Sequence, residues 1–212
     1  MNIIINGFKF MIDLFYGLTG DFGIAIVLLT VVVKLIMLPF SIKQRIAMKK
    51  QISFSKKIEE VKKRYNNNKK KQEEELNKLY LESPKGLLGC LIPILQLPII
   101  SGLYMTINRL QVEAMTILIP WAMNIGSADD KFVVPLLYTL ITIAPSIISY
   151  LNIFSNEEKS ISIKSILPMI IFGLVINIKA PIALGIYFIT SSLFTLIEDI
   201  GFRLYSKNKV FA

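Results

Sequence analysis

Long apolar blocks separated by polar connections constrain the fold of this 212-residue chain more than any other feature. A helix of roughly 20 apolar residues crosses a hydrocarbon core of about 30 Å. Only 18% of the residues are charged and 53% are hydrophobic, whereas a soluble domain keeps about a quarter of its residues charged. A water-exposed fold could not cover such blocks. The sequence therefore predicts a polytopic α-helical membrane protein that uses the bilayer as its solvent.

The order of the blocks predicts an all-α membrane protein with five transmembrane helices. These spans are expected at residues 23–40, 87–107, 132–153, 166–178 and 182–200. Residues 1–22 show near-helical apolar spacing, without a basic n-region before them or a cleavage site after them. They are expected to form an extracytoplasmic amphipathic helix in the membrane interface. The remaining segments are connections at 41–86, 108–131 and 154–165, and a tail at 201–212.

The connection at 41–86 is strongly basic, with 14 Lys or Arg against 6 Glu. Apolar residues recur at helical spacing on both sides of an asparagine run at 66–68, which predicts a helical hairpin. If span one exits into the cytoplasm, that side receives 19 Lys or Arg and the other side receives 4. The positive-inside rule therefore predicts an outer amino terminus and a cytoplasmic carboxyl terminus. The hairpin surface also suits anionic lipid.

Lys34 is the costliest residue in the predicted spans, because an ammonium at the centre of a span costs roughly 2.5–3.5 kcal/mol. It either snorkels to the nearby cytoplasmic boundary or faces a wet intramembrane cavity. Thr30 lies four residues earlier on the same helical face. Polar residues in other spans favour the cavity, although each alone also fits ordinary helix packing. These residues are Gln96 in the second span, Thr139, Thr142, Ser146 and Ser149 in the third, and Tyr187, Thr190, Ser191, Thr195 and Glu198 in the fifth.

The chain has no histidine and a single cysteine, Cys90. The commonest general base, an internal disulfide and the usual zinc sites are therefore missing. No Walker-type glycine loop is present either. We expect no enzyme activity, no cofactor and no metal. The net charge of +9 lies mostly in the hairpin, and sequence recognition of nucleic acid is not expected.

An ordered set of segments resembles the bacterial YidC insertases. The run from Gly23 to Pro39, with a basic residue at Lys34 and a Leu-Pro after it, resembles the first core span of that family. Residues 89–99, residues 119–121 with the acidic pair at 129–130, and residues 185–194 are similar to its second span, outer loop and last span. The sequence departs from the family where Lys34 replaces arginine and Phe188 replaces a common tryptophan. Further departures are Ser192 for a common asparagine and Glu198-Asp199 for a common glutamine pair.

The resemblance implies a bacterial plasma-membrane insertase and chaperone. Its five-helix core would enclose a hydrophilic groove that opens to the cytoplasm and to lipid and is closed on the outer side. Its clients would be nascent membrane proteins, and its candidate partners are the Sec translocon, the ribosome and targeting factors. The groove residues would be Lys34, Thr30, Gln96, Thr142, Ser146, Tyr187, Phe188 and Ser191. A small transporter or channel with a polar cavity is the alternative, and an intramembrane enzyme is a more distant one.

Overall fold

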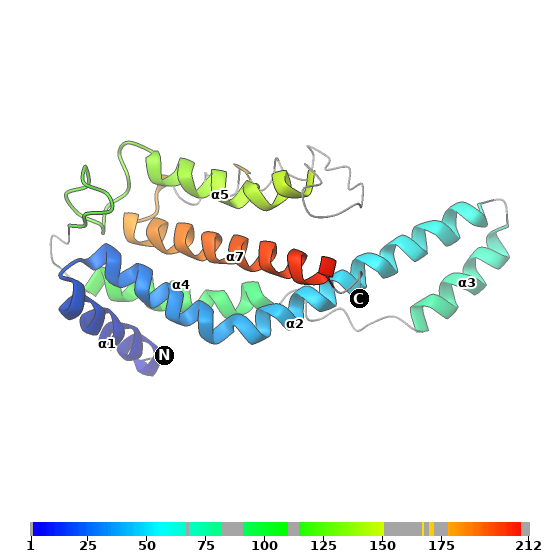
Figure 1. The fold of residues 1–212 in the computed structure, drawn as a ribbon, viewed down its shortest axis with the longest axis horizontal. Coiled ribbons are helices and arrows are strands. Elements are labelled where there is room, and N and C mark those ends of the chain that lie inside the picture. Colours follow the sequence, from blue (N-terminus) through cyan, green and yellow to red (C-terminus); the bar gives the residue numbers. More distant parts are fainter. Residues whose placement is uncertain are drawn as a thin grey trace. The chain divides into compact units, whose positions relative to one another are not determined.

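The computed structural model describes residues 2–66, 68–81, 91–109, 115–150, 167, 170–171 and 178–208. Helices α1, α2, α3, α4, α5 and α7 are the regular elements of this described part, which holds no strand (Figure 1). The chain divides into two compact units. One comprises residues 1–36 and 99–212, and the other comprises residues 37–98. An all-helical fold is thus confirmed for the described residues.

The larger unit begins with helix α1, Asn2–Thr19. Gly20 follows this helix with a φ of 69°, a left-handed conformation that glycine adopts without steric cost. Its N–H donates to the Tyr16 carbonyl and ends the helix. Helix α2, Phe22–Arg64, follows at once, and its first residues up to Ile36 belong to this unit. The unit also holds the second part of α4 (Leu91–Arg109), α5 (Val133–Tyr150) and α7 (Ile182–Asn208).

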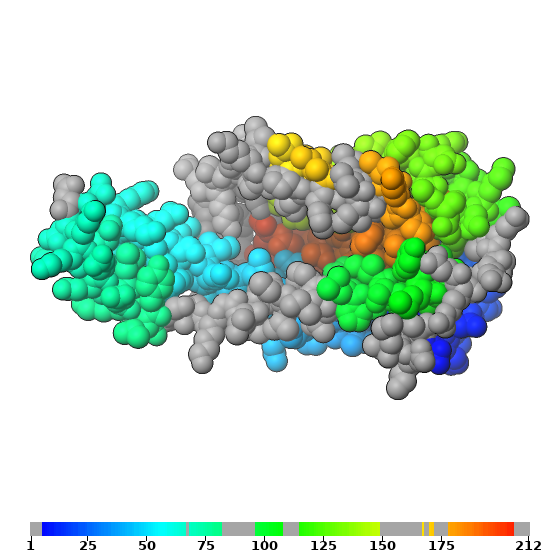
Figure 2. All heavy atoms as spheres, turned by 180° about the vertical axis from the view of Figure 1, so that it is seen from behind, coloured from blue at the N-terminus to red at the C-terminus, as the bar shows by residue number. Residues whose placement is uncertain are grey.

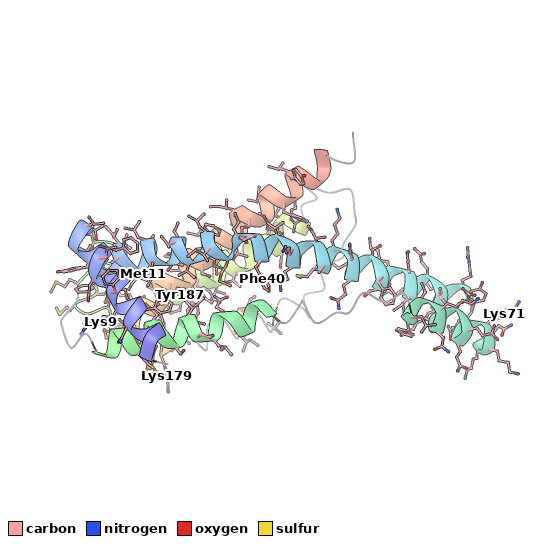
Figure 3. All side chains as sticks on the ribbon, turned by 90° about the horizontal axis from the view of Figure 1, so that it is seen from below. Lys9, Met11, Phe40, Lys71, Lys179 and Tyr187 are labelled. Atoms are coloured by element: carbon pink, nitrogen blue, oxygen red, sulfur yellow. The ribbon has the colours of Figure 1, made fainter. Side chains whose placement is uncertain are left out.

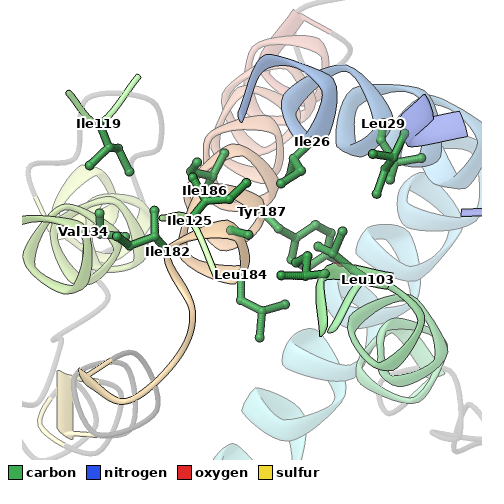
Figure 4. Packing of buried hydrophobic residues seen from close by; sticks show 13 residues of the cluster. Ile26, Leu29, Leu103, Ile119, Ile125, Val134, Ile182, Leu184, Ile186 and Tyr187 are labelled. Carbon is green, nitrogen blue, oxygen red and sulfur yellow. The ribbon is translucent and has the colours of Figure 1, made fainter. Parts of the chain in front are cut away.

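One apolar core joins these helices (Figure 4). Tyr187 and Leu184 of α7 pack in it with Leu103 of α4 and Ile26 of α2. Helix α5 approaches α7 closely, and Val134 is buried at this contact. Residues of the loop that connects α4 to α5 also enter this core. The core therefore lies at the end of the unit where α2, α5 and α7 begin. Its further members are Ile12, Leu29, Ile107, Ile119, Ile125, Ile182, Ala183 and Ile186.

The smaller unit contains a helical hairpin formed by residues 37–64 of α2 and by α3, Lys69–Leu81. The hairpin turns at Tyr65, whose carbonyl accepts from Asn68 N, and the Asn68 side chain caps α3. The Phe54 and Tyr80 rings meet edge to face at 6.3 Å. Figure 2 shows the two helix surfaces packed together, and Lys71 lies near the tip in Figure 3.

Within the part of the chain that the structure describes, two helices are long and apolar enough to cross a membrane, judged by length and composition. They are α2 and the Ile182–Tyr205 part of α7. Shorter apolar stretches are Gln96–Ile107 of α4 and Val133–Ile148 of α5. The predicted loop at 154–165 lies outside the described residues, as do most of the predicted span at 166–178 and the start of the span predicted from residue 87. The five-span arrangement therefore stays a prediction.

Helices α2 and α7 run further than the apolar blocks that they contain. Helix α2 continues past residue 40, the predicted end of span one, and includes Pro39 within its 43 residues. Proline removes one backbone hydrogen bond, but the residues after it are good helix formers that also pack against α3. Helix α7 likewise continues past residue 200 to Asn208, and its end carries the Arg203–Asp199 ion pair at 2.6 Å.

Candidate functional site

Lys34 contacts α7 inside the larger unit. Its Nζ donates a hydrogen bond of 3.1 Å to Thr195 Oγ1, and the contact is partly buried. The Thr195 hydroxyl donates in turn to the Ser191 carbonyl at 2.8 Å. The hydroxyl oxygen can accept from the ammonium because its own proton is committed to the α7 backbone. The Lys34 side chain is thus oriented by a residue of α7 that lies 161 positions away in sequence.

The α7 face that meets Lys34 is formed by residues four apart. Tyr187, Ser191 and Thr195 share this face. Tyr187 and Ser191 are buried, whereas Thr195 is half-buried, so the face becomes more accessible toward the lysine contact. On α2, Thr30 is buried four residues before Lys34. The structure therefore brings Lys34 and Thr30 together with this α7 face in one unit.

Two further predicted groove residues lie on α5. Thr142 and Ser146 are both half-buried and share one helical face. Helix α5 contacts α7 through the Tyr138 and Phe188 rings, whose centroids lie 5.4 Å apart. Phe188 is thus an aromatic packing residue between α5 and α7.

Gln96 belongs to the smaller unit, in the first part of α4, and is half-buried. Its membership of a common groove with Lys34 stays a prediction.

The threonine hydroxyls of the apolar helices form hydrogen bonds within their own helix. Each donates to the carbonyl four residues earlier, which removes the cost of placing a bare hydroxyl in an apolar environment. This local bonding explains why hydroxyls alone do not establish a wet cavity, whereas the Lys34 contact crosses between helices. The threonines that bond in this way are Thr30, Thr106, Thr139, Thr142, Thr190 and Thr195.

A buried carboxylate, Asp21, caps the start of α2. Its Oδ1 accepts from Ile24 N at 2.8 Å and from Thr116 Oγ1 at 2.8 Å, while Oδ2 accepts from Ile117 N at 2.7 Å. Burial alone would raise the pKa of Asp21, but these hydrogen bonds together outweigh it and hold the pKa below its usual value. Gly23 lies so close to Thr116 that a Cβ there would collide with the threonine side chain. The loop is therefore fastened to the first turn of α2.

A second buried carboxylate, Asp129, fastens the same loop to α5. Its Oδ1 accepts from Trp121 Nε1 at 2.9 Å and Lys131 N at 3.1 Å, and Oδ2 accepts from Val134 N at 2.8 Å. Burial would raise the pKa of Asp129, yet the hydrogen bonds from Val134, Trp121 and Lys131 lower it overall. Asp129 thus satisfies an amide at the start of α5 that has no partner within the helix.

The loop between α4 and α5 also closes onto α7. Ile182 N donates to the Ser127 carbonyl at 2.8 Å, and Ala183 N donates to the Ile125 carbonyl at 2.9 Å. The first amides of a helix lack intrahelical partners, and here loop carbonyls supply them. The starts of α2, α5 and α7 are thereby held by one loop, residues 115–132, which we call the outer loop.

Sequence reasoning left three of these residues out of the site. Thr195 was part of the polar stripe predicted in span five but not of the predicted groove set. Asp21 stands just before the first span with a glycine two residues on, a pattern that signals a helix cap. Asp129 was noted only as part of an outer-loop resemblance. Among the described residues, no group of three or more His, Cys, Asp or Glu is placed to hold a metal.

A family model described as 60Kd inner membrane protein matches residues 14–209, nearly the whole chain. The chain belongs to the YidC family of 60Kd inner membrane proteins. The matched range includes Lys34, the α7 face and both buried carboxylates.

Curated YidC relatives align over most of this chain. A Listeria innocua protein named membrane protein insertase YidC 2 is 31% identical over 195 residues, covering 90% of this chain and 67% of the relative. Insertases named YidC from Caldanaerobacter subterraneus and Fusobacterium nucleatum are 28% and 27% identical. They cover 93% of this chain and 92% and 94% of their own lengths. The similarity to YidC proteins therefore extends through the basic hairpin and α7.

Proposed function

We propose that this YidC-family chain is a membrane protein insertase and chaperone in a bacterial plasma membrane. It accepts hydrophobic segments of newly made proteins from the cytoplasm and releases them into lipid. The observation that carries the proposal is the Lys34–Thr195 contact of 3.1 Å, a cation held between two apolar helices of a chain whose relatives are named insertases.

The mechanism is physical rather than covalent. Polar flanks of a client segment would face hydrocarbon at several kcal/mol per unsatisfied group. A five-helix groove open toward the cytoplasm shortens that barrier, and Lys34 gives an acidic client tail a transient partner. Thr195 keeps the ammonium inside the helix bundle rather than snorkelled to the boundary. A carboxylate forms a stronger hydrogen bond with the ammonium than the neutral Thr195 hydroxyl does.

Orientation follows from the basic residues, with the amino terminus outside and the hairpin and tail in the cytoplasm. The hairpin surface is then a landing site for clients, ribosomes or targeting factors, and anionic headgroups bind its lysines. Support comes from the side chains of the hairpin, where the described lysines are exposed along both helices. Sec translocon contact belongs to the same proposal.

The test compares reconstituted variants on two clients that differ only in the charge of the amino-terminal tail. Lys34→Arg should retain insertion, because the charge is kept and guanidinium binds carboxylates well. Lys34→Ala should weaken insertion of the acidic-tailed client more than that of the neutral one. Thr195→Val removes the acceptor at nearly constant volume and should reduce acidic-tail insertion about two- to five-fold, on the order of 0.5–1 kcal/mol.

Thr190→Val is the matched control, since the Thr190 hydroxyl bonds only to the Ile186 carbonyl among the described contacts. Crosslinking from position 34 to a stalled client provides a second readout. Equal insertion of both clients by Lys34→Ala, together with crosslinks only from the outer face of α2, would overturn the groove mechanism.

A further inference from the structure

The outer loop exposes large apolar side chains. Met123 exposes 82% of its surface, Ile117 78% and Met115 62%. Leu118, Trp121 and Phe132 are also exposed. Several large apolar side chains exposed on one folded loop indicate contact with a protein or a membrane.

The loop cannot turn these side chains inward, because its inner positions are already occupied. Thr116 and Asp129 are buried in hydrogen bonds, and Ile119 and Ile125 are buried in the core. Phe132 even adopts a φ of 56°, which is disfavoured for a bulky residue, and its ring is half exposed. The outward apolar surface is therefore a fixed feature of the fold.

This surface continues onto the outside of α5. Phe132 lies just before α5 and is 50% exposed, and Leu136 and Leu140 share one face of α5 and are 54% and 64% exposed. In a spanning α5 this face meets acyl chains. We therefore expect the exposed side chains of the loop to contact lipid as well, closer to the headgroups than the α5 face does.

Trp121 has the surroundings of an interfacial tryptophan. Its ring is partly exposed, its Nε1 is bound to Asp129, and Lys131 Nζ lies 5.6 Å from the ring centroid. Tryptophan with an apolar body and a satisfied N–H is enriched at the headgroup level, where lysine reaches water and phosphate.

We propose that the outer loop is inserted into the outer-leaflet interface of the bilayer through Met115, Ile117, Leu118, Trp121, Met123 and Phe132. The inference rests on the membrane topology of the proposed function. The carboxylate tethers to α2 and α5 hold the loop at the depth where those helices begin.

Trp121 is the only tryptophan of the chain, so its fluorescence reports this loop alone. The protein is reconstituted into phosphatidylglycerol–phosphatidylethanolamine vesicles with bromine either near the headgroup or near the terminal methyl of the acyl chain. Headgroup-proximal bromine should remove a large part of the emission, and the deep bromine much less. Because both leaflets carry bromine, the orientation of reconstituted molecules does not affect the result.

A second variant, Trp121→Phe with Met123→Trp, should show the same preference for shallow bromine. Free N-acetyltryptophanamide, added to the same vesicles, gives the water-exposed reference, which acrylamide quenches and lipid does not. Acrylamide quenching of Trp121 at the reference level, without lipid quenching, would overturn the inference. Shielding of Trp121 from both quenchers would also overturn it, because a protein would then cover the loop.

The same vesicles are assayed for client insertion, which separates this inference from the proposed function. Normal insertion without lipid quenching of Trp121 refutes only the loop inference. Lipid quenching without insertion supports the loop inference and refutes the proposed function.

Discussion

Replacing Asp129 tests whether the outer loop is held by hydrogen bonds to one carboxylate. Asp129→Ala leaves three donors without their acceptor: Val134 N, Trp121 Nε1 and Lys131 N. Val134 is buried, so leaving its N–H without an acceptor costs about 2 kcal/mol. The two more accessible donors can bond to water instead, so the loss of each of their hydrogen bonds costs only about 0.5–1 kcal/mol. Asp129→Ala also removes the free-energy cost of burying a carboxylate, and this gain offsets part of the loss. We expect the free energy of loop opening to fall by about 3 kcal/mol.

Asp129→Asn should cost roughly half as much, because its single oxygen can still accept from Trp121 and Lys131 while its amide opposes Val134 N. Asp130→Ala is the matched control, an exposed neighbour of the same type, and should change stability by less than about 0.5 kcal/mol.

The assay is denaturant titration in detergent micelles, followed by the emission of Trp121. Its signal reports the loop directly, and far-UV circular dichroism reports whether the helices stay folded. Loss of the Asp129 contacts should shift the emission to the red and lower the midpoint of the fluorescence transition. A midpoint for Asp129→Ala equal to that of Asp130→Ala would refute the reasoning. Equal losses for the Ala and Asn variants would show that charge, and not bond geometry, holds the loop.

Three further predictions follow from the same contacts and from the charge distribution. Both buried carboxylates have pKa values below the ordinary 3.8, so their stabilisation is complete above that value and is lost as the pH falls through the lower folded-state pKa. The denaturant midpoint reported by Trp121 fluorescence should therefore decrease as the pH falls below about 4. The decrease should be less steep in Asp129→Asn. Gly185→Ala should destabilise by about 1–3 kcal/mol through collision with Val134, and Val134→Ala should relieve part of that loss in a double-mutant cycle. In a Cys90→Ser background, a cysteine at Ser127 should react with an impermeant thiol reagent in intact cells, whereas one at Ser55 should not; labelling at Ser55 would reverse the proposed topology.

The sequence alone determined the class of protein and the order of its segments, because both depend on local pattern. Apolar runs long enough for a bilayer predict helices wherever they occur. The basic stretch with an asparagine turn predicts the hairpin, and α2 and α3 pair across the turn at Tyr65. The ordered motifs indicated the YidC family, which the family match confirms. The exact helix ends were less predictable, since α2 continues through Pro39 where the apolar pattern stops.

Only the tertiary structure decided which side chain meets which. Lys34 could be predicted as a costly cation, but its acceptor, Thr195, lies 161 residues away. Helical periodicity says which residues share a face and not which face of another helix lies opposite. The same limit hid Asp21, whose partners Thr116 and Ile117 are 95 and 96 residues distant. An aspartate before a span looks like a local cap in sequence, and only packing shows that it also fastens the outer loop.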